Sequence, residues 1–435
     1  MSGYEWPVRD SHARPQVLVT DQSARDVDRY APLAGTSTVP SDNLRRLGVL
    51  LLLGVVVILT GGVVAGAAGL SSTLATPPRA TALAAAPTGV VWTWGANEYG
   101  QLGDGSMNWA VSRTRVRDIS DVRAVVGGAS HSLALSEDGS VWAWGWNKYG
   151  QLGDGDLQTK TVPARVTGLP PVTAISAGAY HSLALESDGT VWAWGFNGSS
   201  QLGDDAELVR PIPGRVTGLP SIVGIAAGAN HSLALGADGT VWGWGNNSDG
   251  ALGDGTLISH GKPARAIALP PMIAIGSGLR HGLGVAEDGT VWAWGLNSAG
   301  QLGKANNDRD PDPQVVKGVP AASSVTGGAH HSLALSDDGF VWAWGDHGSK
   351  PRERDNPDPS AVWVPVPVLD RAQAVSTGYY ESVILRDDGS IWGWSARYPG
   401  QVLPSFPVPV TGLRDVTRIG SGGSHTLAVQ GHVAN

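Results

Sequence analysis

The sequence predicts an all-β fold: a seven-bladed β-propeller, closed by pairing of its N- and C-terminal strands and preceded by one N-terminal transmembrane helix. Three observations predict it. A tryptophan-rich pentapeptide recurs every fifty residues from Val91 onward. Asp-Gly pairs separate runs in which apolar residues alternate with small or polar ones, and an uncharged run of twenty-four residues, 47–70, precedes the first repeat. A fixed period of about 20–50 residues is typical of solenoids and propellers.

The chain begins with a segment that has no apolar period. Residues 1–46 contain six arginines and six acidic residues among prolines and serines, and we expect a disordered cytoplasmic tail. The uncharged run 47–70 follows and is long enough to cross a hydrocarbon core of about 30 Å as a signal anchor. Arg45 and Arg46 precede this run, so the positive-inside bias predicts a single-pass protein of the cell membrane, with its N-terminus in the cytoplasm and its repeats outside.

An alternative interpretation of residues 47–70 remains open. The most apolar part is short and is followed by small residues such as Ala84-Ala85-Ala86, as in a cleaved signal peptide. Cleavage would lead to secretion of the repeats. In either case residues 71–87, rich in Ser, Thr, Ala and Pro, form a linker to a propeller domain over residues 88–430.

Each repeat is expected to supply about four short strands, which make one blade. Within residues 163–203, the segments PARV, VTAISAG, HSLAL and TVWAWG show the period-2 alternation of strands. An Asp-Gly pair precedes the tryptophan segment and predicts a tight hairpin turn in which both residues have positive φ. This pair occurs six times, at Asp138-Gly139, Asp188-Gly189, Asp238-Gly239, Asp288-Gly289, Asp338-Gly339 and Asp388-Gly389.

Seven tryptophan segments accompany only six Asp-Gly turns. The first tryptophan strand, from residue 88, has no strand before it in the chain, and the last partner strand, SGGSHTLAV at 421–429, has no tryptophan strand after it. We therefore expect residues 421–429 to pair with 88–95, so that one blade is built from both ends of the chain. Closure of this kind leaves no blade face uncovered.

Fourteen of the eighteen tryptophans lie in the repeated pentapeptides. Trp142 and Trp144 are two positions apart and point to the same face of their strand. Each could bury ~200 Å², worth about 5 kcal/mol before the entropy cost is subtracted. We expect all fourteen to belong to the core rather than to a ligand site.

The segment GAYHSLALESDGTVWAWGFNGSSQLGDD, residues 178–205, resembles the repeat of the regulator of chromosome condensation family. The shared parts are G-x-x-H-S-L-A-L, D-G-x-V-W-x-W-G and N-x-x-G-Q-L-G, and the resemblance extends from residue 88 to about 430. It implies a seven-bladed propeller closed by its termini. Founding members of the family are nucleotide exchange factors for a small GTPase, and another member type is a secreted bacterial inhibitor of β-lactamases.

Composition excludes several kinds of site. The chain of 435 residues has a formal net charge of −8, which argues against a nucleic-acid surface. It contains no cysteine and hence no disulfide, thiolate nucleophile or cysteine metal site. DRDPDP at 308–313 spaces aspartates like a calcium loop but lacks the central glycine and the closing glutamate. We expect no metal and no cofactor.

Histidines recur at 131, 181, 231, 281, 331 and 425, with Glu381 at the seventh equivalent position. The same residue in nearly every blade, tens of ångströms apart around a ring, cannot form one active site. A side chain that bridges its loop to neighbouring backbone explains the repetition better. With no nucleophile–base pair elsewhere, we expect a protein that is not an enzyme.

The candidate binding residues are those that vary between blades. Connections in an antiparallel blade alternate between its ends, so the G-x-x-H loop and the stretch after W-x-W-G lie on one rim, opposite the Asp-Gly turns. Aromatic residues and arginine are the usual interface anchors. The predicted partner-binding residues on this rim are Trp146, Tyr180, Phe196, Arg280, His330, Asp346 and Tyr380. The same rim carries the divergent stretch 346–363, which is expected to be an exposed loop.

Two functions remain open from the sequence. The first is a non-catalytic, extracytoplasmic binding module, inhibitor-like or envelope-organising, whose monomeric propeller grips a protein partner with one rim. The second is a guanine-nucleotide-exchange-type regulator of a small GTPase, by analogy with the family. The cellular compartment separates the two, because the exchange substrate lies inside the cell.

Overall fold

The computed structural model describes residues 88–305, 308–346, 365–395 and 407–431. The described residues all belong to one compact unit of the chain. The predicted tail, membrane span and linker, residues 1–87, lie outside the described residues, as does the divergent stretch after Asp346. Within the described ranges, no helix has the length and apolar character needed to cross a membrane.

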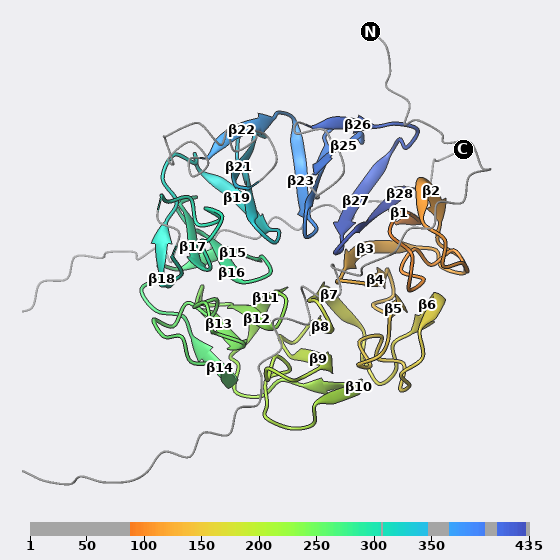
Figure 1. Ribbon diagram of the computed structural model, residues 1–435, viewed down its shortest axis with the longest axis horizontal. Coiled ribbons are helices and arrows are strands. Elements are labelled where there is room, and N and C mark those ends of the chain that lie inside the picture. Colours follow the sequence, from red (N-terminus) through yellow and green to blue (C-terminus); the bar gives the residue numbers. More distant parts are fainter. Residues whose placement is uncertain (1–87, 306–307, 347–364, 396–406, 432–435) are drawn as a thin grey trace, which may run out of the picture. The chain divides into compact units, whose positions relative to one another are not determined.

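The described residues form an all-β structure of repeated four-stranded blades (Figure 1). The first strand of each blade is the innermost, and these strands are β3 (Val122–Gly127), β7 (Val172–Ala177), β11 (Ile222–Ala227), β15 (Met272–Ser277), β19 (Ala322–Gly327), β23 (Ala372–Thr377) and β27 (Val416–Ser421). The second strands are β4 (His131–Ser136), β8 (His181–Glu186), β12 (His231–Gly236), β16 (His281–Ala286), β20 (His331–Ser336), β24 (Glu381–Arg386) and β28 (His425–Gly431).

The third strand of each blade carries the tryptophan pentapeptide, and the fourth is the outer edge. The third strands are β1 (Gly89–Gly95), β5 (Val141–Gly145), β9 (Val191–Phe196), β13 (Val241–Gly245), β17 (Val291–Gly295), β21 (Val341–Gly345) and β25 (Ile391–Ser395). The fourth strands are β2 (Ala110–Arg115), β6 (Lys160–Arg165), β10 (Val209–Arg215), β14 (His260–Arg265), β18 (Asp310–Val315), β22 (Val366–Leu369) and β26 (Val408–Val410). Neighbouring strands within each blade are antiparallel.

One sheet joins the two ends of the described chain. β1 pairs with β28 over seven residue pairs, from Gly89 opposite Gly431 to Gly95 opposite His425. The prediction that the ends pair is therefore confirmed, but the expected segment 421–429 is displaced. Ser421 ends β27 and the pairing strand begins at His425, because Gly422, Gly423 and Ser424 form a G-x-x-H loop between the two strands. A single pair, Gly89 opposite Val122, links this blade to β3.

The hydrophobic core lies between neighbouring blades rather than within one sheet. Trp194 on β9 packs with Leu133, Leu135 and Val141 of the preceding blade, and Trp192 packs against the same cluster. Both tryptophans of a pentapeptide therefore face one side, as expected. Their burial differs: Trp194 is fully buried, as are its equivalents Trp144, Trp244, Trp294 and Trp344, whereas the first tryptophan of every pentapeptide is only partly buried. The expectation that all fourteen are equally core residues was too broad.

The Asp-Gly turns differ in detail from the expected turn. Gly139 has a φ of 83°, but Asp138 keeps a negative φ, so the prediction of two positive φ angles was wrong. The aspartate instead accepts a hydrogen bond from the backbone N–H two residues later, over 2.9 Å from Ser140 N to Asp138 Oδ1. This side-chain acceptor stabilises a wider turn that needs only one glycine in the left-handed region.

Candidate functional site

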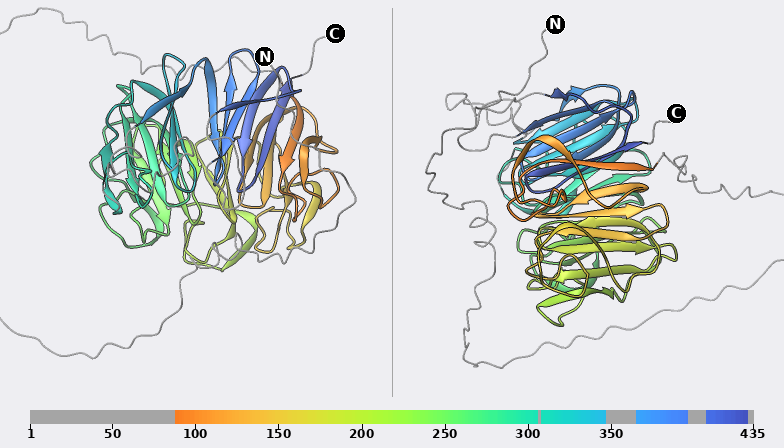
Figure 2. Two further views of the ribbon diagram at one scale, coloured as in Figure 1. Left: turned by 45° about the horizontal axis from the view of Figure 1, so that its top comes forward. Right: turned by 90° about the vertical axis from the view of Figure 1, so that its right-hand side faces the viewer.

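Two sets of loops lie on one rim of the propeller, which we call the G-x-x-H rim. The strands run between the two rims (Figure 2). Each first strand leads through a G-x-x-H loop into the second strand, and each third strand ends beside that loop, so the described loops that start after W-x-W-G in β1, β5, β9, β13 and β17 begin on the same rim. Direct hydrogen bonds join the two sets: Trp146 N donates to Ser130 O over 2.9 Å, and Phe196 N donates to Tyr180 O over 2.8 Å. The variable positions of both loops therefore lie side by side.

The repeated histidines connect neighbouring blades. The imidazole Nε2 of each one lies within hydrogen-bond distance of a serine hydroxyl on the next blade. These pairs are His131–Ser182 at 3.1 Å, His181–Ser232 at 2.9 Å, His231–Ser277 at 3.0 Å, His281–Ser332 at 2.9 Å, His331–Ser382 at 2.9 Å and His425–Ser132 at 2.8 Å. We call these six contacts the histidine belt. They agree with the expectation that the histidines are structural, although the partner of each is a hydroxyl of the next blade and not backbone.

The belt serines are not arranged as nucleophiles. Ser132 Oγ donates its proton to the backbone carbonyl of Gln101 over 2.8 Å, so it accepts from the Nε2–H of His425. The same carbonyl accepts the indole N–H of Trp144, also at 2.8 Å. A serine whose proton points to a carbonyl, beside an imidazole that donates to it, is a structural element. It lacks the geometry of a serine–base pair.

Space for each imidazole comes from the glycine that opens its motif. A Cβ on Gly128 would lie 2.1 Å from Cε1 of His131, a distance that no real contact reaches. Burial lowers the pKa of His131 to about 3, with the neighbouring His425 adding to the effect. The G-x-x-H motif is thus explained by packing of a neutral histidine.

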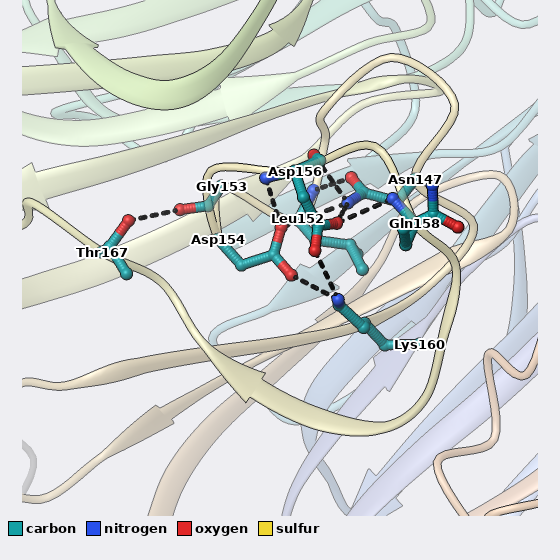
Figure 3. A network of polar contacts seen from close by, with 8 residues as sticks. All are labelled: Asn147, Leu152, Gly153, Asp154, Asp156, Gln158, Lys160 and Thr167. Carbon is teal, nitrogen blue, oxygen red and sulfur yellow. Dashed lines mark hydrogen bonds and ion pairs between the residues drawn. The ribbon is translucent and has the colours of Figure 1, made fainter.

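The N-x-x-G-Q-L-G motif is also structural (Figure 3). Asn147 Oδ1 accepts the backbone N–H of Leu152 over 3.0 Å, and its amide Nδ2 donates to Asp156 O over 3.0 Å. Lys160 Nζ lies 2.7 Å from Asp156 Oδ2 and 3.4 Å from Asp154 Oδ2. These contacts pin the long loop after β5 in one shape, so side chains at its variable positions are presented by a rigid support.

Three of the predicted binding residues contact one another. Trp146 and Tyr180 have ring centroids 5.2 Å apart in an edge-to-face arrangement, and Tyr180 lies 6.4 Å from Phe196. Tyr99 and Tyr149 complete the group, at 5.2 Å and 5.6 Å from Trp146. Tyr149 is also 4.8 Å from Phe196. We call these five partly buried residues the aromatic cluster.

The other four predicted residues make different contacts. Arg280 is ion-paired with Asp249, and its guanidinium donates to Ser248 Oγ over 3.3 Å. The rings of His330 and Tyr380 are 6.4 Å apart, and Asp346 N donates to His330 O over 2.8 Å. Burial lowers the pKa of His330, while the nearby Asp346 opposes this change. Arg280 therefore has an acidic partner on its own rim.

Sequence reasoning missed Tyr99 and Tyr149, because they lie within the N-x-x-G-Q-L-G motif that was assigned to the scaffold. The position before the glycine of this motif in fact varies, as Tyr99, Tyr149, Ser199, Asp249 and Ala299. That variation was the signal that could have identified both tyrosines. Tyr379 was missed too, in the G-x-x-H loop position that is alanine in four of the other blades.

A central cavity of about 320 Å³ is lined by the innermost strands of all the blades. Its walls are mainly Gly, Ala, Ser, Thr and branched aliphatic residues, and Tyr379 is its one aromatic lining residue among those described. The Tyr379 hydroxyl is buried without a hydrogen-bond partner in the described part of the chain, and burial raises its pKa. Within that part, His, Asp and Glu do not gather in threes or more as a metal site would require.

The profile of the regulator of chromosome condensation (RCC1) repeat matches residues 88–135, 138–185, 188–235, 238–285 and 288–335. The chain belongs to the RCC1 repeat family. A second RCC1 repeat profile matches residues 122–151, 172–201, 222–251 and 272–301, each covering the G-x-x-H and W-x-W-G motifs described above. A search of curated protein sequences finds no match.

Three solved structures resemble this RCC1-repeat chain. Prp20p of Saccharomyces cerevisiae, described with its binding to Gsp1p and histones, is 24% identical, with 80% of this chain and 92% of that chain covered and a TM-score of 0.69. Yeast RCC1 (Prp20) bound to Kap60 is 24% identical, covering 80% and 90% with a TM-score of 0.71. Human WBSCR16 is 21% identical, covering 79% and 100% with a TM-score of 0.69. At these identities the similarity concerns the fold.

Proposed function

We propose that this RCC1-repeat protein is a non-catalytic protein-binding module whose G-x-x-H rim grips a partner through the aromatic cluster. The observation that carries the proposal is the contact between Trp146, Tyr180 and Phe196. The residues that repeat in every blade have packing or hydrogen-bonding roles, whereas these three occupy positions that differ from blade to blade. Partly exposed tyrosine and tryptophan rings on a rigid support are common anchors of protein interfaces.

The proposed architecture is a closed, monomeric seven-bladed propeller. The eight-stranded sheet contains two four-stranded blades joined by the single pair Gly89–Val122, and five further four-stranded sheets accompany it, which makes seven blades. The proposal also includes a membrane anchor at residues 47–70, with an N-terminal cytoplasmic tail and the propeller outside the cell. The uncharged run after Arg45 and Arg46 supports this topology, and secretion after cleavage is the alternative.

The nucleotide-exchange alternative rests on family membership alone. Prp20p is described with its binding to Gsp1p, which is a statement about that protein. The aromatic cluster favours a protein-binding role but does not indicate that the partner is a GTPase. An extracytoplasmic propeller would not meet a cytosolic GTPase, so compartment again discriminates between the two functions.

Site-specific photo-cross-linking in intact cells tests the binding rim. A photoreactive phenylalanine analogue replaces Trp146 in one variant, and Ser187, an exposed residue beside an Asp-Gly turn, in the control. We expect a discrete cross-linked product from position 146 and none from 187. The Tyr180→Ala, Phe196→Ala double substitution should remove that product while the melting temperature is retained. Products from position 187 alone would place binding on the opposite rim.

External protease tests the proposed topology in the same cells. We expect the propeller to be digested or shaved from intact cells while the N-terminal tail stays protected. Recovery of the propeller from the cytosol in soluble form would contradict both the anchored and the secreted versions. A mature N-terminus near residue 87 would replace the anchor with secretion.

A further inference from the structure

We propose that the partner presents lysine or arginine side chains to the aromatic cluster, so that cation–π contacts and acidic neighbours select a basic segment. This inference rests on the proposed function and adds the chemistry of the partner. The loops that carry most of the cluster expose apolar side chains and are mostly acidic, and one ring of the cluster already contacts a lysine.

Exposed apolar side chains lie on the same loops as the cluster. Met107 and Trp109 are 51% and 60% exposed on the loop after β1, and Leu157 and Leu208 are 48% and 60% exposed on the loops after β5 and β9. Large apolar side chains that are half exposed on three consecutive loops form a surface suited to a partner. Residues of the aromatic cluster lie on each of these three loops.

The charges on these loops are mostly acidic. Residues 96–109, 146–160 and 196–210 contain seven acidic residues, Glu98, Asp104, Asp154, Asp156, Asp204, Asp205 and Glu207. They contain three basic residues, Lys148, Lys160 and Arg210, so the net charge is −4 (3 − 7). A partner that approaches this sector meets a negative field, which favours cationic side chains and speeds their association.

Two of the three bases are already neutralised within their own loops. Lys160 pairs with Asp154 and Asp156, and Arg210 Nη2 lies 2.6 Å from Asp204 Oδ2. Glu98 and Glu207, in contrast, are exposed and lack an ion-pair partner among the described residues. These two carboxylates, on the loops after β1 and β9, are therefore available to a basic partner.

Lys148 shows that a ring of this cluster accepts a cation. Its Nζ lies 5.6 Å from the centroid of the Tyr149 ring, within the range of a cation–π contact. Lys148 is itself exposed, so its side chain can be displaced. An incoming arginine would stack on the same rings and meet Lys148 as a like-charged competitor. The sign of the Lys148 effect on binding thus reports the charge of the partner.

Peptide selection on the full-length protein in detergent micelles tests the proposal. The probe is a displayed library of random dodecapeptides, followed by two synthetic peptides that differ only in carrying three arginines or three glutamates at the same positions. We expect enrichment of Arg and Lys, and about tenfold weaker binding of the arginine peptide after Trp146→Ala, a loss in the range of about 1.4 kcal/mol. Melting temperatures are compared first.

Charge substitutions give the decisive comparison. Glu98→Lys and Glu207→Lys should weaken the arginine peptide, whereas Lys148→Glu should strengthen it, and raised salt should reduce all three differences. Enrichment of acidic peptides, or weaker binding of the arginine peptide to Lys148→Glu, would overturn the cationic partner. If one of these two results is obtained while binding still depends on Trp146, the cationic partner is wrong but the binding rim of the proposed function is still supported. Binding that is unchanged by Trp146→Ala but lost on substitution of Ser187 would overturn both the cationic partner and the proposed binding rim.

Discussion

The imidazole Nε2 of His425 lies 2.8 Å from the hydroxyl of Ser132, across 293 positions of the chain. His425 begins β28 and Ser132 lies in β4, on the blade that follows around the ring. The same contact joins most other neighbouring blades, so the two ends of the chain are connected by the bond that holds consecutive repeats together. Bringing the two chain ends together costs conformational entropy. This contact and the β1–β28 ladder offset that cost once they have formed.

Truncation after Gly420 should destabilise the whole propeller. The cut removes β28, which supplies seven residue pairs to β1, and it removes Gln430, whose Oε1 accepts the indole N–H of Trp92 over 2.9 Å. We expect a lower and broader melting transition, with tryptophan fluorescence that shows Trp92 and Trp94 more exposed to water. A truncated chain that melts like the full-length protein would contradict the pairing of the ends.

Acid should unfold the protein through its buried histidines. Burial lowers the pKa of His131, His181 and His281 to about 3, and that of His231 and His425 to about 4. In the unfolded chain these groups titrate near 6.5, so below that pH the unfolded state binds more protons. Stability is therefore complete above about pH 6.5 and falls towards pH 3–4. Five such groups give a slope of up to about 7 kcal/mol per pH unit.

Denaturant melts between pH 8 and pH 4 measure this slope. The His181→Gln variant should lose some stability at pH 8 and show a shallower acid dependence than the parent protein. A slope that does not change with the loss of one histidine would show that other groups control acid unfolding.

Glu381 should have the opposite pH dependence. It occupies the histidine position of its blade and accepts a hydrogen bond from Thr426 Oγ1 over 2.8 Å. Burial raises its pKa to about 7, so between about pH 4.5 and pH 7 the folded state binds more protons than the unfolded state. The fold accommodates the neutral carboxyl better than the charged one. The stability that protonation of Glu381 contributes is fully present below about pH 4.5 and is lost as the pH rises through about 7.

The Glu381→Gln variant removes this loss. We expect it to be more stable than the parent protein at pH 8, by up to about 3 kcal/mol, and nearly equal to it at pH 4.5. The comparison requires only denaturant melts at the two pH values. An equal difference at both would assign the effect to packing rather than to the charge.

Gly128 and His131 should be energetically coupled. A Cβ at Gly128 would meet the His131 ring, so Gly128→Ala should destabilise the protein by about 2–4 kcal/mol through overpacking. His131→Ala also destabilises, because it leaves a cavity and removes the contact with Ser182. The double variant should cost less than the sum of the two, since the contacts with the His131 ring are gone and only the contact of the new Cβ with the backbone carbonyl of Gly178, 2.6 Å away, is left. Additive effects in this double-mutant cycle would contradict the steric explanation of the motif.

Nucleotide exchange should be absent. If the propeller acts outside the cell, the chain has no cytosolic GTPase as substrate. We expect the purified full-length protein at micromolar concentration to leave GDP release from cytosolic small GTPases unchanged, with EDTA-stimulated release as the positive control. Accelerated release would favour the alternative function over the binding module proposed here.

The repeat made much of the fold predictable. The fifty-residue period, the Asp-Gly pairs and the mismatch between seven tryptophan strands and six turns led to four-stranded blades and to the pairing of the chain ends, which β1 and β28 display. Alternation of strand direction also placed Trp146, Tyr180 and Phe196 on one rim. These features follow from local periodicity and chain direction, which are properties of the sequence itself.

The partners of individual side chains were decided by the tertiary structure. Residue spacing could not show that the belt histidines bond to serines of the next blade or that Ser277 supplies the hydroxyl where Gly282 replaces the repeated serine. Nor could it show that Asp138 caps its turn without a positive φ. It also assigned Tyr99 and Tyr149 to the scaffold, although their rings complete the aromatic cluster. The sequence by itself determined which residues repeat. Only the packing of blade against blade determined what each one touches, because those contacts depend on distances between sheets that no periodicity along the chain encodes.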